Sequence, residues 1–538
     1  MKNIKCLSLL FFLLFLLGCV DDDSRYGDIE IDEITIEGIE EYREIEFGGR
    51  LTITPTVKTK FGEKSDLSYV WYKYNQKQVV ADTLSFEKNL DVTIADALPG
   101  DEITLSFKVI DNRTGVYQLH NSKFKTVGVY AGGTLMLCRN DGQYDLSMLK
   151  KDGVTFYENI YSLANNGEKL GDKSKRLFLT HSYAKNPLAT KAVIVACDDH
   201  SGGVYLDPDA LIRKNYMREK FMFHTDEELP GDLVITGVCN GQSTEYMIVN
   251  GKVHGRTFSG SEAINWESEY VILSEPSDYE MAPFVTQPFD NDNWGGPYYG
   301  NPIFYDNLHG RFMINETGGY FSFLGGKLND FSQFNPNHIG ENIHLVATGC
   351  VEDNLNKAWA LLKNTETGEY LLIKYEIVMD EKWNNGFISS FKQTLSSGSC
   401  PGMYGAETFV PGNKYAISTS NMWEQHVEGL SNICFYLSGN KVYAFNTQSY
   451  SEGVIIDGDK EGYTITGLDC TEVPSPTAEK PDATRIQLTL CVQDRGVTDK
   501  QGGIAVYQLN QIGGLSARKL YAKAGFCDEV VCTIEKQD

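Results

Sequence analysis

The sequence has no block of basic residues: 48 Lys and Arg stand against 73 Asp and Glu, which gives a formal charge of −25. Nucleic-acid binding depends on clustered cations beside the phosphates, so we expect no nucleic-acid partner. After the first segment, no hydrophobic run is long enough to span a bilayer. We therefore expect the remainder of the chain to be soluble.

Catalytic signatures are also missing. The sequence contains no HExxH zinc helix, no GxSxG nucleophile turn, no Walker-type phosphate loop and no dinucleotide fingerprint. It has no CxxC pair, which excludes the common zinc frameworks. These absences favour a protein without catalysis, metal or cofactor. An enzyme that gathers carboxylates from distant strands needs no local motif, so that alternative stays open.

The twelve cysteines do not read as a disulfide framework. Within an apolar strand a thiol behaves as a small hydrophobe, so we expect most of them to be free and buried. Cys527 and Cys532 would face opposite sides of one strand and could neither bridge nor chelate together. The cysteines that lie inside apolar strands are Cys138, Cys197, Cys434 and Cys491.

What the sequence does contain begins with a secretion signal over residues 1–18. Lys2 and Lys5 precede a short apolar run, and Gly18 is the small residue before Cys19. This arrangement resembles a bacterial lipobox, in which Cys19 becomes the lipidated N-terminus. Several acyl chains on one cysteine give a stable membrane anchor without a transmembrane helix.

Acidic residues follow the cysteine at once. Asp21, Asp22 and Asp23 resemble the signal that exports lipoproteins to the outer surface of gut-type Gram-negative bacteria; the alternative is a solvated acidic linker. Residues 19–29 lack apolar periodicity and read as a tether. We expect a lipid anchor in the outer membrane, with the protein facing the cell exterior.

Residues 30–127 alternate apolar and polar side chains, the period of half-buried antiparallel strands. Ile103 to Val109 alternates in this way, and residues 111–115 provide a hairpin turn. Trp71 occupies the place where an immunoglobulin-type domain buries a tryptophan, although no cysteine is present to form the inter-sheet bridge. These features predict an immunoglobulin/PKD-like β-sandwich, which usually acts as a spacer.

Residues 128–538 contain a recurring hairpin. An apolar strand, a polar turn with glycine and a second strand that opens on an aromatic residue recur seven times, at a mean spacing of roughly sixty residues. This spacing suits four-stranded blades, so we predict a seven-bladed β-propeller. The aromatic residues are Tyr144, Tyr205, Tyr246, Tyr320, Tyr370, Tyr443 and Tyr507.

The last segment, FCDEVVCTIEK, is one strand more than seven units need. Pairing with the first unit would close the ring and remove an open sheet edge. A solenoid would show a tighter period, and a row of sandwiches would need linkers that the sequence lacks.

The best candidate binding segment is residues 289–305. It combines Trp294, Tyr298 and Tyr299 with amides, carboxylates and glycines. Aromatic faces beside hydrogen-bonding groups suit a neutral sugar ring or an extended peptide. A second segment of the same composition contains Trp423 and His426. The alternative is that these aromatics pack between blades.

Isolated acidic residues and histidines carry weaker signals. Asp198, Asp199 and Asp207 could belong to an acid/base or metal cluster, but aspartates more commonly close turns. The histidines lack ligand spacing and read as structural.

The order of these features resembles the PKD-like lipoproteins of gut bacteria: a lipobox with an acidic export signal, YVWYKY around Trp71, a turn of the IDNRTGVYQ type and a long β-rich region. The resemblance implies a place beside SusC/SusD-type outer-membrane uptake systems. It implies no catalytic residue.

Three hypotheses follow. The first is a non-catalytic surface binder that serves the uptake of glycans or peptides. The second is a propeller-type glycoside hydrolase or lyase that acts on captured polysaccharide. The third is a scaffold that only contacts the transporter complex.

Overall fold

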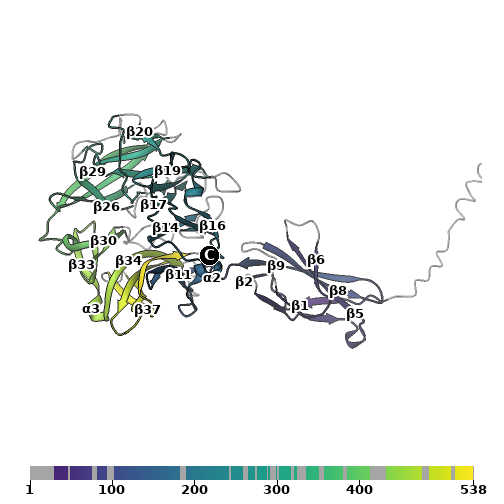
Figure 1. Cartoon of the computed structure of the whole chain (residues 1–538). Helices are drawn as coiled ribbons and strands as arrows, with labels where there is room; N and C mark the ends of the chain where they lie inside the picture. The colour runs from purple at the N-terminus through teal and green to yellow at the C-terminus, as the bar shows by residue number, and fades with distance from the viewer. Residues whose placement is uncertain are drawn as a thin grey trace, which may run out of the picture. The chain divides into compact units, whose positions relative to one another are not determined.

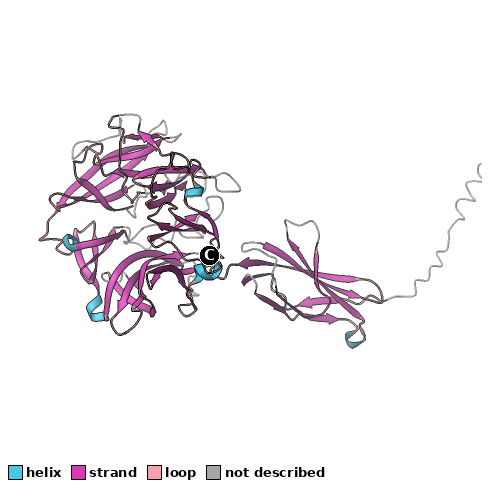
Figure 2. Cartoon of the chain, in the orientation of Figure 1, coloured by secondary structure: helices cyan, strands magenta, loops and turns pink. Residues whose placement is uncertain are grey.

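The computed structural model describes residues 30–536 apart from 47–48, 76–80, 94–101, 182–189, 241–243, 258–264, 273–274, 287–288, 291–297, 300–301, 317–319, 324–334, 351–356, 380–384, 412–431, 475–483 and 511–514. The chain divides into two compact units, Met1–Val129 and Tyr130–Asp538. Strands dominate both units, and helices are few and short (Figure 2). No helix in the described part is long and apolar enough to cross a membrane.

The first unit is a β-sandwich. Its larger sheet has the strand order β2-β9-β8-β5-β6, and the strand pairs β1-β4 and β3-β7 cover it. A short turn of 3-10 helix, η1 (Gly62–Lys64), precedes β5. The strands are β1 (Ile34–Glu37), β2 (Tyr42–Glu46), β3 (Arg50–Ile53), β4 (Thr56–Thr59), β5 (Leu67–Asn75), β6 (Asp82–Ser85), β7 (Leu90–Thr93), β8 (Glu102–Asp111) and β9 (Tyr117–Val127).

The predicted alternation of apolar and polar residues is present in β8, and its apolar side chains pack in the core of this unit. Ile103 and Phe107 on β8 are buried, whereas their neighbours in the strand are partly exposed. Trp71 is fully buried, stacks on Phe107 at 4.2 Å between ring centroids, and donates from Nε1 to the carbonyl of Glu87 at 3.1 Å. The hydrogen bond satisfies the indole, so the ring can fill the core without an inter-sheet disulfide.

In its described residues the second unit contains seven successive sheets of three or four strands, numbered here in chain order, and one two-stranded sheet (Figure 1). Their strand pairs are antiparallel except for the parallel pair of β20 and β25 in the fourth sheet. The first sheet is β12-β11-β10-β38, the second β13-β14-β15-β16 and the third β17-β18-β19. Their strands are β10 (Gly133–Asn140), β11 (Gln143–Leu149), β12 (Phe156–Tyr157), β38 (Glu529–Lys536), β13 (Ser174–His181), β14 (Thr190–Cys197), β15 (Gly203–Leu206), β16 (Arg213–Tyr216), β17 (Ile235–Asn240), β18 (Thr244–Val249) and β19 (Lys252–Thr257).

The fourth sheet is β20-β25-β24-β23, the fifth β26-β27-β28-β29, the sixth β30-β31-β32-β33 and the seventh β34-β35-β36-β37. Their strands are β20 (Val271–Ile272), β23 (Ile303–Asp306), β24 (Arg311–Glu316), β25 (Tyr320–Phe323), β26 (Ile343–Cys350), β27 (Lys357–Asn364), β28 (Tyr370–Met379), β29 (Asn385–Leu395), β30 (Ala406–Pro411), β31 (Ile433–Ser438), β32 (Lys441–Asn446), β33 (Ser451–Asp457), β34 (Tyr463–Pro474), β35 (Thr484–Asp494), β36 (Gly502–Asn510) and β37 (Ser516–Cys527). Short helical turns lie between sheets: α2 (Ile160–Ala164), η2 (Arg218–Lys220), η3 (Met403–Gly405) and α3 (Gly458–Glu461).

Each of the seven predicted hairpins is an antiparallel strand pair in a different sheet. Their places within the sheets are not all equivalent. In the third sheet the hairpin is formed by β17 and β18, whereas in the sixth it is formed by the two central strands, β31 and β32. As predicted, the last strand, β38, pairs with β10 in the first sheet.

Seven hydrophobic cores lie between neighbouring sheets. Each joins one sheet to the next, and one joins the seventh sheet to the first, where Val506 packs with Met136. In β14, Val193 belongs to the core shared with the first sheet and Ile194 to the core shared with the third. Burial on both faces explains why strands such as VIVAC are continuously apolar.

One strand of each sheet, which we call the leading strand, lies beside the leading strand of the next sheet. β38 lies beside β13, β13 beside β17, β26 beside β30, β30 beside β34, and β34 beside β38. In the fourth sheet this place is taken by residues 281–286, which pair with β23 through the bridges Met281↔Asp306 and Thr286↔Ile303. This segment lies beside the leading strands on both sides. A Cβ on Gly237 of β17 would lie 3.0 Å from the carbonyl oxygen of Pro283. On the other side, the hydroxyl of Thr286 bonds to that of Thr348 on β26. These contacts link each leading strand to the next, and β34 to β38.

Asparagines fasten one end of several leading strands. Asn250 and Gly251 form a tight turn with φ of 51° and 73°, values that suit a two-residue hairpin. The side-chain oxygen of Asn250 accepts the amide N–H of Val234, directly before β17, at 2.9 Å. The same kind of bond joins Asn140 to Asp528, Asn307 to Leu345 and Asn440 to Ile465.

Candidate functional site

The predicted binding segment lies between the leading strand and the second strand of the fourth sheet. Its described part includes a short antiparallel pair, β21 (Phe289–Asp290) and β22 (Tyr298–Tyr299), with Phe289 opposite Tyr299. Tyr298 and Tyr299 thus lie in the arm of a hairpin. Trp294 lies outside the described residues.

A buried polar cluster holds the base of this hairpin. Thr286 is 2% exposed and exchanges backbone hydrogen bonds with Ile303 at 3.0 and 2.9 Å. Its hydroxyl also bonds to the hydroxyl of Tyr375 at 2.7 Å and to that of Thr348. Thr348 in turn donates to the carbonyl of Trp359 at 2.8 Å. The two ends of the segment are therefore fixed to each other and to the fifth sheet.

The second predicted segment has the same topological position in the sixth sheet. It joins β30 to β31, whose ends pair as Pro411↔Cys434. Asn432, at the start of β31, is buried and its carbonyl accepts the amide N–H of Thr447 at 2.8 Å. Trp423 and His426 lie outside the described residues.

The N-terminal signals also lie outside the described residues, which begin at Glu30. This applies to Cys19 and to Asp21, Asp22 and Asp23.

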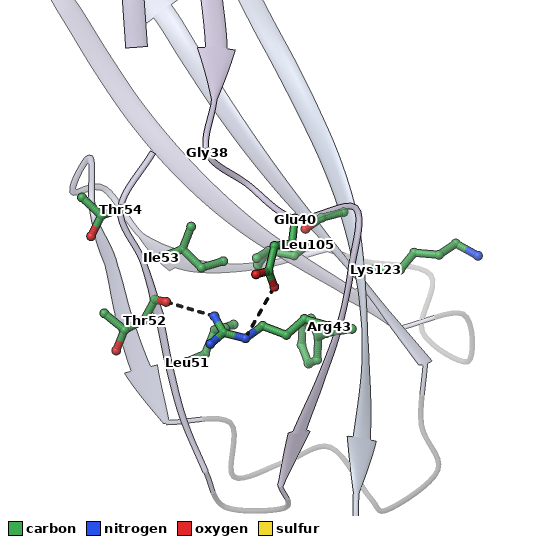
Figure 3. Close-up of a pocket in the computed structure, with 11 residues that line it drawn as sticks. Gly38, Glu40, Arg43, Leu51, Thr52, Ile53, Thr54, Leu105 and Lys123 are labelled. Carbon is green, nitrogen blue, oxygen red and sulfur yellow. Dashed lines mark hydrogen bonds and ion pairs between the residues drawn. The ribbon is translucent and has the colours of Figure 1, made fainter. Parts of the chain in front are cut away.

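A groove in the first unit lies between β2 and β3 (Figure 3). Its volume is about 120 Å³, and Leu51, Leu105 and Phe124 contribute its apolar lining. Arg43 crosses it, donating to the carbonyl of Thr52 at 3.3 Å and approaching Glu40 at 3.8 Å. Small-molecule sites usually enclose roughly 300–1,000 Å³. The groove is too small for such a ligand, and Arg43 already has partners.

The acidic residues singled out by sequence serve as turn and ion-pair groups. Asp199 accepts hydrogen bonds from the Ser201 hydroxyl at 2.6 Å and from the Gly202 amide at 3.0 Å. Asp207 accepts the amide N–H of Asp209 at 2.9 Å. Asp198 pairs with Arg176 at 3.0 Å. These contacts are what turn closure requires, and they leave the carboxylates apart from any shared site.

Two of the described histidines form contacts within the fold. His254 is 5% exposed, its Nδ1 lies 2.9 Å from the carbonyl of Glu267, and burial lowers its pKa. His309 pairs with Asp278 at 2.8 Å. Among the residues that the structure describes, no group of three or more His, Cys, Asp or Glu side chains could hold a metal ion.

The side chains of nine cysteines are described; all nine are free thiols, and all but the half-buried Cys532 are buried. Burial raises the pKa of Cys197 to about 11 and that of Cys434 further. Thiols with raised pKa values are poor nucleophiles. They pack as small hydrophobes, as predicted.

Sequence reasoning missed the cluster of Thr286, Thr348 and Tyr375. The three residues are distant in the chain, and threonine carries no spacing signal. Thr286 lies three residues before Phe289, so the only local indication was its position next to the aromatic segment.

Comparison with known proteins identifies the N-terminal part. A model of the PKD-like family matches residues 19–174. This stretch includes all the described residues of the first unit and extends into the first sheet of the second. The chain therefore carries a PKD-like domain. No curated protein matches the sequence.

Three of the solved structures that match this chain are the following. A quinonprotein alcohol dehydrogenase-like protein from Bacteroides thetaiotaomicron is 12% identical, with 92% of this chain and 97% of that chain covered and a TM-score of 0.32. The extracellular domain of a protein classed as a hybrid two-component system, from the same organism, is 10% identical, with coverages of 89% and 65% and a TM-score of 0.33. Dipeptidyl peptidase 4 of Porphyromonas gingivalis is 8% identical, with coverages of 76% and 56% and a TM-score of 0.25. At these identities and TM-scores, the likeness carries no argument about this chain.

The buried cluster at the base of the hairpin predicts the effect of Thr286→Val. The substitution keeps the shape but leaves the Tyr375 hydroxyl without this partner, so the free energy of unfolding should fall by about 1–3 kcal/mol in urea denaturation. The matched control is Thr365→Val, because Thr365 is exposed and bonds to Asn342 at 3.2 Å. It should cost no more than about 0.5 kcal/mol. Equal stability of the two variants would show that the cluster does not hold the segment.

Proposed function

We propose that the second unit is a seven-bladed β-propeller and that it binds a glycan or a peptide at the cell surface without converting it. Seven sheets, seven inter-sheet cores and the contacts between successive leading strands support the propeller. The first sheet receives its leading strand, β38, from the C-terminal part of the second unit, which would close the ring. The ring is then a rigid scaffold for the segments that connect its strands.

One observation carries the binding proposal: both aromatic segments occupy the same topological position. Each connects a leading strand to the second strand of its sheet, in the fourth and sixth sheets. Radial repetition of one unit brings equivalent connections to the same face. Trp294, Tyr298 and Tyr299 would then share a face of the ring with Trp423 and His426.

The chemistry of these segments favours binding. Aromatic rings can stack on the apolar face of a sugar or on peptide side chains, and the neighbouring amides and carboxylates can orient the ligand. Binding residues commonly lie on loops that a rigid scaffold positions. Asp199 and Asp207 close turns and Asp198 forms an ion pair, which supports binding over hydrolysis by these three residues.

The N-terminal part gives the proposed location. Lipidation of Cys19 would anchor the chain in the outer membrane, and the PKD-like domain would act as a spacer between the anchor and the propeller. The resemblance to PKD-like lipoproteins supports SusC/SusD-type proteins as partners in the uptake of a glycan or peptide. In this role the protein would capture the nutrient for the transporter.

A ligand that binds only the folded state must raise the thermal unfolding midpoint. We will test a panel of neutral oligosaccharides, peptides and calcium, and we expect one of these ligand classes to raise the midpoint. At one hundred times the dissociation constant, the stabilisation is about 2.7 kcal/mol. Trp294→Ala combined with Trp423→Ala should abolish the shift.

Tyr74→Ala is the matched control for this experiment, since Tyr74 is an aromatic residue of the first unit that is 39% exposed. It should leave the ligand shift unchanged. If the protein converts the ligand that it binds, the hypothesis of a propeller-type hydrolase or lyase would replace that of a non-catalytic binder. If no member of the panel raises the thermal unfolding midpoint, the result would favour the hypothesis of a scaffold that contacts only the transporter complex.

The export signal predicts a change in surface exposure. Replacing Asp21, Asp22 and Asp23 by Ala should reduce labelling of the protein on intact cells by a membrane-impermeant reagent, while the protein stays in the membrane fraction. Replacing Asp28, Glu30 and Glu33 by Ala removes the same charge further along and should leave labelling unchanged. Equal labelling of both variants and the unchanged protein would contradict export by the acidic triplet.

A further inference from the structure

A buried ion pair lies between the second and third sheets. Arg256 on β19 is opposite Glu245 on β18, and the two residues are 1% and 0% exposed. The Nε and Nη2 atoms of Arg256 contact Oε2 of Glu245. A buried ion pair is stable only when its remaining hydrogen-bonding groups also find partners. The partner of Nη1 therefore decides what this site can hold.

Two buried donors meet beside this ion pair. The Cζ atom of Arg256 lies 3.7 Å from the centroid of the Trp266 ring, which is fully buried. Among the residues that the structure describes, none accepts a hydrogen bond from Arg256 Nη1 or from Trp266 Nε1. Nη1 is one bond from Cζ and Nε1 is an atom of the indole, so both donors lie at this stacked contact. Since neither group can accept, the group that completes the cluster is an acceptor.

A second cation, Lys220, lies next to the same contact. Its carbonyl accepts the amide N–H of Trp266 at 2.9 Å. Its Nζ lies 5.2 Å from the centroid of the Tyr205 ring, and Cζ of Arg256 lies 5.8 Å from that centroid. Burial and the charge of Arg256 lower the pKa of Lys220. In the described residues the cluster thus has two cations, Arg256 and Lys220, for one carboxylate, Glu245.

We propose that a monovalent inorganic anion of the size of chloride binds here, accepting hydrogen bonds from Arg256 Nη1 and Trp266 Nε1 and balancing the charge of Lys220. A water molecule would also accept from the two donors, but it would leave the extra positive charge uncompensated. An anion compensates this charge, and the attraction is stronger in a core of low dielectric constant than in water.

The bound ion would stabilise the contact between two sheets. Tyr205 lies in the second sheet and Arg256 in the third, and both Tyr205 and Trp266 belong to the core that joins them. Lys220 is half-buried, so the ion would exchange with solvent beside it. A ligand that binds only the folded state raises its thermal unfolding midpoint.

The test measures the thermal unfolding midpoint of the purified chain while sodium chloride replaces sodium gluconate at constant ionic strength. Gluconate is too large for a buried site of this kind. We expect the midpoint of the second unit to rise by several degrees and to level off as chloride saturates the site. The chain has a formal charge of −25 and repels anions as a whole, so a saturable rise would indicate a local site. Equal midpoints in the two salts would overturn the proposal.

Three variants locate the effect. Lys220→Met keeps the apolar stem without the charge and should lose the rise with chloride. Lys363→Met is the matched control, because Nζ of Lys363 lies 5.3 Å from the centroid of the Tyr370 ring in the fifth sheet. It should keep the rise. Trp266→Phe keeps a ring beside Arg256 but removes the N–H donor, and it should weaken the effect of chloride. A full rise in both Lys220→Met and Trp266→Phe would contradict the proposed site.

Crystals of the unsubstituted chain grown in sodium bromide locate the ion without any variant, through the anomalous scattering of bromine. We expect an anomalous peak within hydrogen-bonding distance of Arg256 Nη1 and Trp266 Nε1. A water molecule at this position without an anomalous signal would overturn the proposal, and so would bromide found elsewhere as an adventitious ion only.

Discussion

Burial of both faces of every sheet is the constraint on which the second unit depends. A sheet with one solvent-exposed face needs a packing partner on its other face only. The second sheet needs one on both faces, because β14 contributes Val193 to one core and Ile194 to the next. Apolar surface stabilises by about 25 cal/mol per Å² when it leaves water, and an open array would forfeit this at both ends. The C-terminal strand meets this requirement, because β38 pairs with β10 in the first sheet. The core around Met136 and Val506 then lies between the seventh sheet and the first.

In the proposed propeller, the sheets would supply the stability and the connections between strands would bind the ligand. The tight turn Asn250–Gly251 fastens one end of the leading strand β17. In the fourth and sixth sheets, longer connections follow the leading strand, from Thr286 to Ile303 and from Pro411 to Ile433. Those connections can vary in sequence without cost to the cores, because their ends are fixed by contacts such as that between Thr286 and Tyr375. The two aromatic segments lie in connections of this type.

The sequence predicted the local features best. Alternation located the core of the first unit around Trp71 and Phe107, and the hairpin repeat found one strand pair in each of the seven sheets. It did not find equivalent pairs: Tyr246 opens the second strand of its sheet, whereas Tyr443 opens the third. When both faces of a sheet are buried, every strand is apolar, so the pattern cannot tell one neighbouring pair from another. The cluster at Thr286 could not be predicted because it depends on contacts between residues far apart in sequence.

The most direct test of this account is calorimetry of the chain without residues 529–538, compared with a chain that lacks only residues 537 and 538. If β38 closes the ring, its removal exposes the core between the seventh sheet and the first and deprives the first sheet of a strand. We expect the unfolding transition of the second unit to shift down by many degrees or to disappear, while that of the first unit stays in place. An unchanged transition of the second unit would contradict closure as the basis of its stability.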